Sequence, residues 1–419
     1  MEDSITAMPV RIVPFDLGVI LNDEMKDRIK AFAQEKGILH DIDDNKREKA
    51  IIKKCTIKCI FPGGTSLYVF DFGIAVMAFT DGSMDLNIDD FAIDYCIDRK
   101  NDHASVRKIE HPAMTDAYDT IQGFRRIVHD LRGKKDEIRR SGNIDHEKGE
   151  DSLMYAMSLS FFKYLFEGKK DVCSWNELPD WVKRNVSVLM DPAILYLEDS
   201  KMLSGNTEKK EEWKKEVFDN ICTDRAYPDY ERRPNLYTFM SWSAVVILGN
   251  IDRSVEEEYT ALEVNLQANW YYVHCMDRYL PDNAKEAVKR RIKAAHIKEL
   301  YNESEVLVDI LTHVPDTSVP SRFRDIQKGL TKTSEFVSEN ERYQRKLRYI
   351  QDGMKTESQR KAVISSGILL MMIAFFQMIP VLSGIISGAY ETIVYPLLLL
   401  VVATVIILIR YDRIWFNND

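Results

Sequence analysis

The sequence predicts an α+β protein made of an N-terminal α/β domain, a long-helix stalk or funnel, and two C-terminal transmembrane helices. Three observations carry this prediction. Runs of β-branched and aromatic residues between Gly and Pro turns dominate the first 250 residues, helical periodicity follows, and two uncharged apolar stretches close the chain. We therefore expect three parts, at residues 1–250, 251–361 and 362–419.

The two uncharged stretches indicate that the chain crosses a membrane twice. Residues 362–390 contain no Asp, Glu, Lys or Arg, and residues 392–409, after Glu391, again contain none. About 20 apolar residues span the hydrocarbon core of a bilayer, which places the spans at about 362–382 and 392–410. The mean hydropathy of the whole chain, −0.28, hides this feature because the rest of the sequence is polar.

The distribution of basic residues predicts the orientation in the membrane. Arg360 and Lys361 precede the first span, Arg410 and Arg413 follow the second, and the short loop between the spans contains no Lys or Arg. Because loops rich in Lys and Arg stay in the cytoplasm, we expect both termini there, in a multi-pass protein of the cell's inner (plasma) membrane. Residues 1–361 are then cytosolic.

Alternation and turn residues predict the elements of the α/β domain. Strands are expected at 10–13, 55–61, 66–79, 186–197 and 241–248. Gly73 lies inside the third run and indicates a bulge or a break between two strands. Helical spacing of apolar residues predicts helices at 23–36, 115–140 and 151–168.

The stalk shows longer helical patterns. One helix is expected from about Val255 until Pro281, and Asn283 is a candidate cap for a second helix over 284–313. A third helix begins near Ser321 and runs into the first span without an intervening proline. Its a and d positions are Phe323, Ile326, Leu330, Thr333, Val337, Asn340, Gln344, Leu347, Gln351 and Met354. A seam of mixed polarity predicts an oligomeric, partly hydrated stalk.

Several kinds of chemistry are not expected. The chain has no Walker sequence, dinucleotide fingerprint, nucleophile elbow or His-Glu-x-x-His pair, so we expect neither an enzyme nor a cofactor. Cys55 and Cys59 lie four apart without a second pair at zinc-site spacing, so no metal site is expected. The net charge of −9 argues against binding to a nucleic-acid polymer.

This layout, with a long helix that enters the first of two C-terminal spans and a very short external loop, resembles the CorA-type metal-ion transporter superfamily. The resemblance implies a homo-oligomer, a pentamer in that family, whose first spans line a central pore. The family carries a Gly-Met-Asn triplet after the first span, whereas residues 379–388 here read IPVLSGIISG. The departure counts against selective Mg²⁺ transport, although a divalent-cation transporter stays open as the alternative function.

A divergent group of CorA-like proteins that accompanies type III CRISPR systems is similar in keeping the two-span tail while departing from the triplet. That resemblance implies a membrane channel or effector of antiviral defence. It also implies a nucleotide second messenger that binds the cytosolic domain, either a cyclic oligoadenylate or an S-adenosylmethionine–AMP conjugate.

Gln377 is the only amide or ionisable side chain of the first span, and it defines the candidate pore-lining face. That face comprises Ser366, Leu370, Ile373, Gln377, Val381 and Gly384. Such a mostly apolar surface is typical of a gate that closes by dewetting. The alternative is that Gln377 makes an interhelical hydrogen bond.

The pore mouth is the second candidate site. Pro380 is followed by Ser383-Gly384 and Ser387-Gly388, and these residues either break the helix at the membrane surface or shape the mouth of the pore. Glu391, in the external loop, either attracts cations there or is a solvated loop acid.

The candidate messenger site is a cluster of arginines and tyrosines in the cytosolic domain. It comprises Arg225, Tyr227, Tyr230, Arg232, Arg233 and Tyr237. Arginine pairs with phosphate in bidentate fashion and tyrosine stacks on bases, so the combination suits a nucleotide. The alternative is a basic surface that contacts only water or lipid.

Overall fold

The computed structural model describes residues 6–41, 46–80, 84–85, 112–131, 157–163, 236–240, 244–249, 251–289 and 336–385, with isolated positions between 292 and 331. The chain divides into two compact units. Unit 1 comprises Met1–Tyr279 with Ser304–Tyr343, and unit 2 comprises Leu280–Glu303 with Gln344–Asp419.

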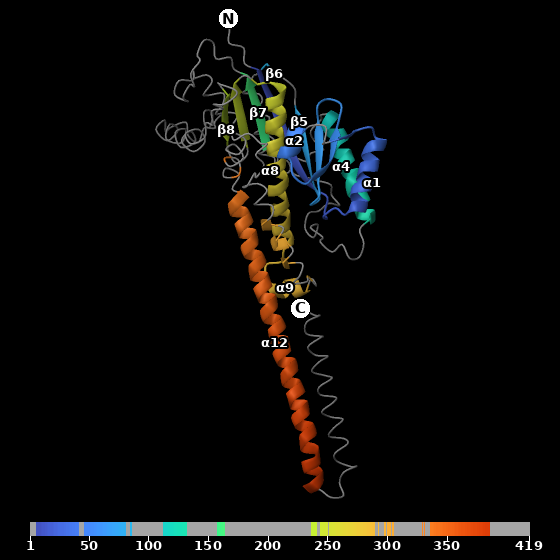
Figure 1. Ribbon diagram of the computed structural model, residues 1–419, viewed down its shortest axis with the longest axis vertical. Coiled ribbons are helices and arrows are strands. Elements are labelled where there is room, and N and C mark those ends of the chain that lie inside the picture. The colour runs from blue at the N-terminus through green and yellow to red at the C-terminus, as the bar shows by residue number, and fades with distance from the viewer. Residues whose placement is uncertain are drawn as a thin grey trace, which may run out of the picture. The chain divides into compact units, whose positions relative to one another are not determined.

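The described part of unit 1 is built on one sheet of nine strands (Figure 1). The strands are β1 (Thr6–Asp16), β2 (Leu39–His40), β3 (Cys55–Ile60), β4 (Ser66–Phe70), β5 (Ile74–Thr80), β6 (Met84–Asp85), β7 (Met157–Lys163), β8 (Leu236–Met240) and β9 (Ala244–Gly249). Their order is β2-β3-β4-β5-β1-β7-β9-β8, and β6 pairs with the start of β1. All pairs are antiparallel except β7 with β9.

Helices cover both faces of this sheet. The described helices are α1 (Asp23–Glu35), α2 (Lys46–Ile51), α4 (Pro112–Leu131), α8 (Arg253–Tyr279), α9 (Ala284–Lys289) and α12 (Phe336–Ile385). Met77 and Phe79 of β5 point into a core shared with α1 and α4. On the other face α8 packs against β1 and β5, and the rings of Phe72 and Tyr272 lie 5.2 Å apart. Because both faces are covered, every residue from Ile74 to Phe79 is buried.

Local sequence signals explain several of these boundaries, and the break predicted at Gly73 is confirmed. Asn22 caps α1, since its side chain accepts a hydrogen bond of 2.9 Å from the backbone of Met25. Gly73 adopts a φ of 76° and separates β4 from β5. The predicted strands at 10–13, 55–61 and 241–248 are present, and so is the helix predicted at 115–140 as far as Leu131. The strand predicted at 186–197 lies outside the described residues.

The helix predicted over 151–168 is wrong, because residues 157–163 form strand β7. The apolar residues in this region fit a helical spacing, but Met-Ser-Leu-Ser-Phe also alternates with the period of a strand. Tertiary pairing decides between the two periods. β7 pairs with β1 on one edge and with β9 on the other, so its backbone groups are used by the sheet.

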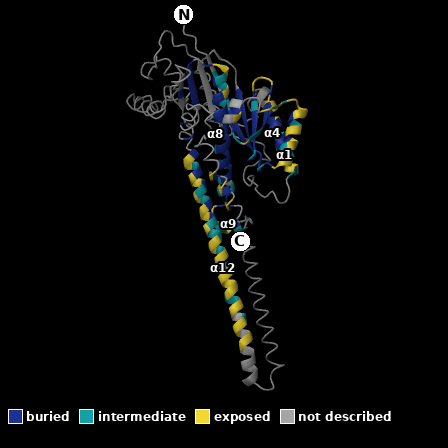
Figure 2. Cartoon of the chain, viewed as in Figure 1, coloured by how far each residue is buried: buried dark blue, intermediate teal, exposed yellow. Residues whose placement is uncertain are grey.

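Helix α8 is buried on nearly all sides (Figure 2). From Glu258 to Ala268 only Thr260 is partly exposed. Beyond α8, Asn283 accepts a hydrogen bond of 3.0 Å from the backbone of Glu286 and so caps α9, as predicted. The description of this helix ends at Lys289, well before the predicted end at residue 313.

Helix α12 is a single helix of 50 residues, which at 1.5 Å per residue is about 75 Å long. It passes through Ala362 without interruption, as predicted. It also passes through Pro380 and is described as far as Ile385, between Gly384 and Ser387, so the proline alone does not end it. No helix within the described part of the chain is long and apolar enough to span a membrane.

On α12 the buried face is shifted from the predicted seam, since three of its positions lie one residue earlier in the sequence. Buried side chains occur at Phe336, Asn340, Tyr343, Leu347 and Ile350. The predicted seam shares Asn340 and Leu347 with this set, but its Val337 is 38% exposed, and Gln344 and Gln351 are half-buried. The larger side chains at 336, 343 and 350 make a more apolar face than Val337 and the two glutamines. Phe323, Ile326 and Thr333 lie outside the described residues.

Within unit 2, α9 packs closely on α12 at a glycine. A Cβ atom at Gly353 would lie 2.5 Å from the Cβ of Ala284, so the two helices can approach this closely only without a side chain there. Lys346 and Asp282 form an ion pair of 3.5 Å beside this contact. The helix pair is therefore fixed near the end of the charged part of α12.

Candidate functional site

The uncharged part of α12 exposes large apolar side chains over more than half of its circumference. Val363 is 71% exposed, Leu370 66%, Leu369 55%, Phe376 53% and Ile364 46%. At 100° per residue these positions spread over about 240° of the helix. A helix that is hydrophobic all round belongs in a protein core or in a membrane. This segment is therefore the first candidate functional region.

The predicted pore-lining residues share one exposed face of this helix. Ser366, Leu370, Ile373 and Gln377 are all exposed, and their spacing of four, three and four residues places them on one stripe. Ile368 and Met372 lie on the opposite side and are partly covered.

The remaining candidates of this region are only partly described. The backbones of Val381, Ser383 and Gly384 belong to α12, but their side chains lie outside the description. Glu391 lies outside the described residues altogether. The face is therefore defined by its first four residues.

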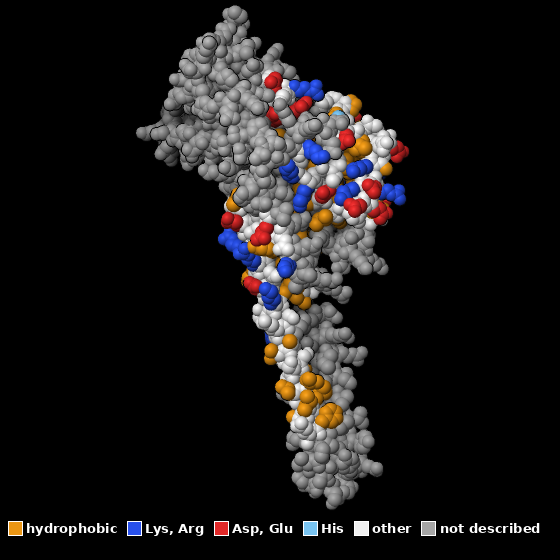
Figure 3. Space-filling model, in the orientation of Figure 1, with side chains coloured by type: hydrophobic (Ala, Val, Ile, Leu, Met, Phe, Trp, Pro, Cys, Tyr) orange, Lys and Arg blue, Asp and Glu red, His pale blue; other side chains and the backbone are white. Residues whose placement is uncertain are grey.

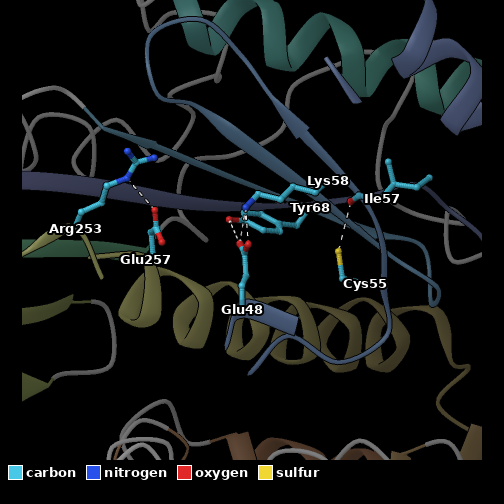
Figure 4. Close-up of polar contacts among 7 residues, drawn as sticks. All are labelled: Glu48, Cys55, Ile57, Lys58, Tyr68, Arg253 and Glu257. Carbon is cyan, nitrogen blue, oxygen red and sulfur yellow. Dashed lines mark hydrogen bonds and ion pairs between the residues drawn. The ribbon is translucent and has the colours of Figure 1, made fainter. Parts of the chain in front are cut away.

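A second candidate region, which the sequence analysis missed, is a buried polar cluster formed by α2, β3 and β4 (Figure 4). The ammonium group of Lys58 lies 2.7 and 2.6 Å from the two carboxylate oxygens of Glu48. The hydroxyl of Tyr68 donates a hydrogen bond of 2.8 Å to the same carboxylate. Lys58 and Tyr68 are cross-strand partners, and the ammonium lies 5.2 Å from the centre of the tyrosine ring.

This cluster has the properties of a structural clamp. Burial and the neighbouring Glu48 raise the pKa of Tyr68 far above its usual value, so the phenol remains a donor. Burial also raises the pKa values of Cys55 and Cys59 to about 12, so neither thiol is a nucleophile at neutral pH. Cys55 donates to the carbonyl of Ile57 over 3.4 Å. Every charged group here is used to hold α2 against the sheet.

A third candidate is Glu263 in the middle of α8. Its side chain is fully buried, and neither carboxyl oxygen has a hydrogen-bond partner. Burial raises the pKa of Glu263 to about 8. The amide of Gln267, one turn further along, lowers this pKa in part, although it makes no hydrogen bond of normal geometry to the carboxyl group. The group is therefore protonated and uncharged at neutral pH. No sequence signal identified it, because it follows Leu262 within an ordinary helical pattern.

The candidate messenger site is almost wholly outside the described residues. Arg225, Tyr227, Tyr230, Arg232 and Arg233 all lie there. Tyr237 belongs to β8, but its side chain is not described. Among the residues that the structure does describe, no group of three His, Cys, Asp or Glu side chains could hold a metal ion.

Comparison with models of protein families, with curated proteins and with solved structures gave no match for this chain.

Replacing Glu48 with Gln should destabilise the protein by about 3–5 kcal/mol, because Lys58 would be left as an unpaired buried charge. Replacing Glu48 and Lys58 together with Met should cost much less. The measurement is thermal unfolding of the full-length protein in detergent. Glu257→Gln, which breaks the exposed 3.0 Å pair with Arg253, is the control and should cost less than about 1 kcal/mol. Equal losses for Glu48→Gln and the double variant would contradict the clamp.

Replacing Glu263 with Gln should stabilise the protein by an amount that grows with pH. The folded state holds the proton of Glu263 up to about pH 8, whereas the unfolded chain releases it near the ordinary pKa of 4.5. The stabilising effect of the protonated acid is therefore complete below pH 4.5 and is lost as the pH rises through 8. Unfolding midpoints of both proteins between about pH 5 and pH 9 measure the difference. A difference that does not change over this range would contradict the buried, neutral acid.

Proposed function

We propose that this protein is a CorA-like oligomeric membrane channel or effector whose cytosolic α/β domain controls a pore lined by α12. The observation that carries the proposal is the composition of α12. One helix begins with residues that pack in unit 1 and ends in an uncharged segment in which every exposed large side chain except Gln377 is apolar.

The apolar segment supports a position in the bilayer. In the sequence, residues 362–390 contain no charged side chain, and a span of the hydrocarbon core needs about 20 apolar residues. Soluble monomers rarely expose a continuous apolar surface of this extent. Lipid and neighbouring copies of the chain would cover it, with Lys355, Arg360 and Lys361 at the cytoplasmic boundary.

The continuity of α12 supports control of the pore from the cytosol. Near its start, Arg342 pairs with Asp277 of α8 over 3.3 Å, and Tyr343 is fully buried. Every residue between this point and Gln377 belongs to one hydrogen-bonded helix. A rotation or shift of its cytosolic end would therefore move the stripe of Ser366, Leu370, Ile373 and Gln377.

The polarity of that stripe supports a gate rather than an ion-coordinating filter. Leu370 and Ile373 would form apolar rings in a pentamer, and Gln377 would form one ring of amides. Apolar constrictions close by losing their water. In this proposal a small change in diameter switches conduction.

We propose a nucleotide second messenger as the signal, either a cyclic oligoadenylate or S-adenosylmethionine–AMP, in type III CRISPR antiviral defence. The support is the resemblance in layout together with the cluster of arginines and tyrosines from Arg225 to Tyr237. A ligand shifts a two-state equilibrium only by its difference in affinity for the two states. Micromolar binding corresponds to about 8 kcal/mol, which is enough for such a switch.

The full-length protein should remain in the membrane fraction after alkaline carbonate washing, and its native mass in nanodiscs should be that of a pentamer. Both results follow if the apolar face of α12 is covered by lipid and by other copies of the chain. Release from membranes, or the mass of a monomer, would contradict the proposed pore.

Isothermal titration calorimetry with cyclic oligoadenylates and with S-adenosylmethionine–AMP should detect binding to the intact protein. Arg232→Ala with Arg233→Ala should abolish the heat without changing the oligomeric mass, because the phosphates lose their bidentate partners. Lys30→Ala, at an exposed position of α1, is the control. Absence of heat with all these ligands, together with metal-dependent flux in liposomes, would favour the cation transporter.

A further inference from the structure

The exposed side of α12 is one continuous stripe that is charged in its first half and apolar in its second. Its members are Glu341, Arg345, Arg348, Asp352, Lys355, Gln359, Val363, Ser366, Leu370, Ile373 and Gln377, and all eleven side chains are exposed. Successive members are three or four residues apart, which keeps them on one face of a helix. Figure 3 shows Lys and Arg side chains on the upper half of α12 and hydrophobic side chains further down.

The charged half of the stripe is directed to the same side as the predicted pore face. Both halves belong to one unbroken helix. If Leu370 and Gln377 face the axis of an oligomer, Arg345 and Arg348 therefore face it as well. The first half of the stripe then lines the vestibule through which ions reach the pore.

This vestibule carries an excess of positive charge. On this stripe the exposed charged side chains are Arg345, Arg348 and Lys355 against Glu341 and Asp352. Three basic and two acidic groups give an excess of one per chain, which becomes five in a pentamer.

Of the three basic side chains on the stripe, Arg345 is the one for which no partner occurs among the described residues. Asp352 is balanced by Lys355, which lies 3.7 Å away. Arg342 pairs with Glu339 at 2.7 Å, and Arg348 bonds to the hydroxyl of Tyr301. Arg345 makes no ion pair with any residue that the structure describes. Its charge is therefore available to ions in solution.

A tightly packed interface between copies would not accommodate this face. Five arginines brought together at a dry seam would repel one another and would lose their hydration. The residues suited to packing are Phe336, Asn340, Tyr343, Leu347 and Ile350, and they occupy the opposite side of the helix. The charged face therefore suits a water-filled lumen.

We infer that the pore of this protein conducts small inorganic anions in preference to cations. The inference rests on the proposed function and names the ion class that would pass through that pore. A cleft lined by one sign of charge concentrates ions of the opposite sign, and rings of Arg or Lys favour anions. The apolar constriction has no charged side chain that would reverse this preference. Arg345 is the residue that contributes most to it.

The test uses the full-length protein with Leu370→Ser and Ile373→Ser, which hydrate the apolar rings so that the pore conducts without a messenger. Planar bilayers with a KCl gradient give the chloride-to-potassium permeability ratio from the reversal potential. We expect chloride to be favoured. Arg345→Glu in this background should lower the ratio by at least about threefold, because each chain loses two units of positive charge. Arg345→Lys should preserve the ratio, since it keeps the charge.

Lys30→Glu is the matched control, because it makes the same change of charge at an exposed position of α1 and should leave the ratio unaltered. The oligomeric mass of each variant is measured first, so that only assembled protein enters the comparison. A potassium-selective pore, or a ratio that Arg345→Glu does not alter, would overturn the anion preference and leave the channel intact. No current from the hydrated variant would overturn the channel itself.

Discussion

The continuous backbone of α12 is the constraint on which the proposed mechanism depends. Within a helix each residue is tied to its neighbours by hydrogen bonds, so side chains 30 residues apart keep a fixed angular relation. This relation connects Arg345, in the charged part, with Gln377, in the apolar part. Along one face of α12 the exposed side chains are mostly charged before Lys361 and uncharged after it. The three- and four-residue spacing of these side chains stays the same in both parts.

Unit 1 combines a well-packed region with one that stores an unfavourable interaction. The sheet is covered on both faces, and Glu48, Lys58 and Tyr68 hold α2 to it through short bonds. By contrast, α8 buries Glu263 without a hydrogen-bond partner. An unsatisfied buried polar group costs free energy, so any rearrangement that hydrates Glu263 would be favoured by that amount.

The packed side chains and the exposed charged side chains lie on opposite sides of α12. The packed side carries Phe336, Tyr343, Leu347 and Ile350, and Gly353 permits the close approach of Ala284. The open side carries a net positive charge above an apolar constriction. A pore built in this way would select ions by the field of its vestibule, and its constriction would decide only whether water and ions pass.

The sequence by itself determined the features that depend on neighbouring residues: the cap of α1 at Asn22, the break at Gly73 and the uncharged stretch from Ala362. It also gave the candidate pore face, because three- and four-residue spacing is a local property of a helix. Only the tertiary structure decided that residues 157–163 form β7, since that segment fits two periods and the pairing with β1 and β9 selects one. Two further features depend on elements that only folding brings together. One is the burial of Glu263 without a hydrogen-bond partner, and the other is the contact of Glu48 with Lys58. A local pattern limits the conformations that a segment can adopt, whereas burial and pairing with distant segments select among them.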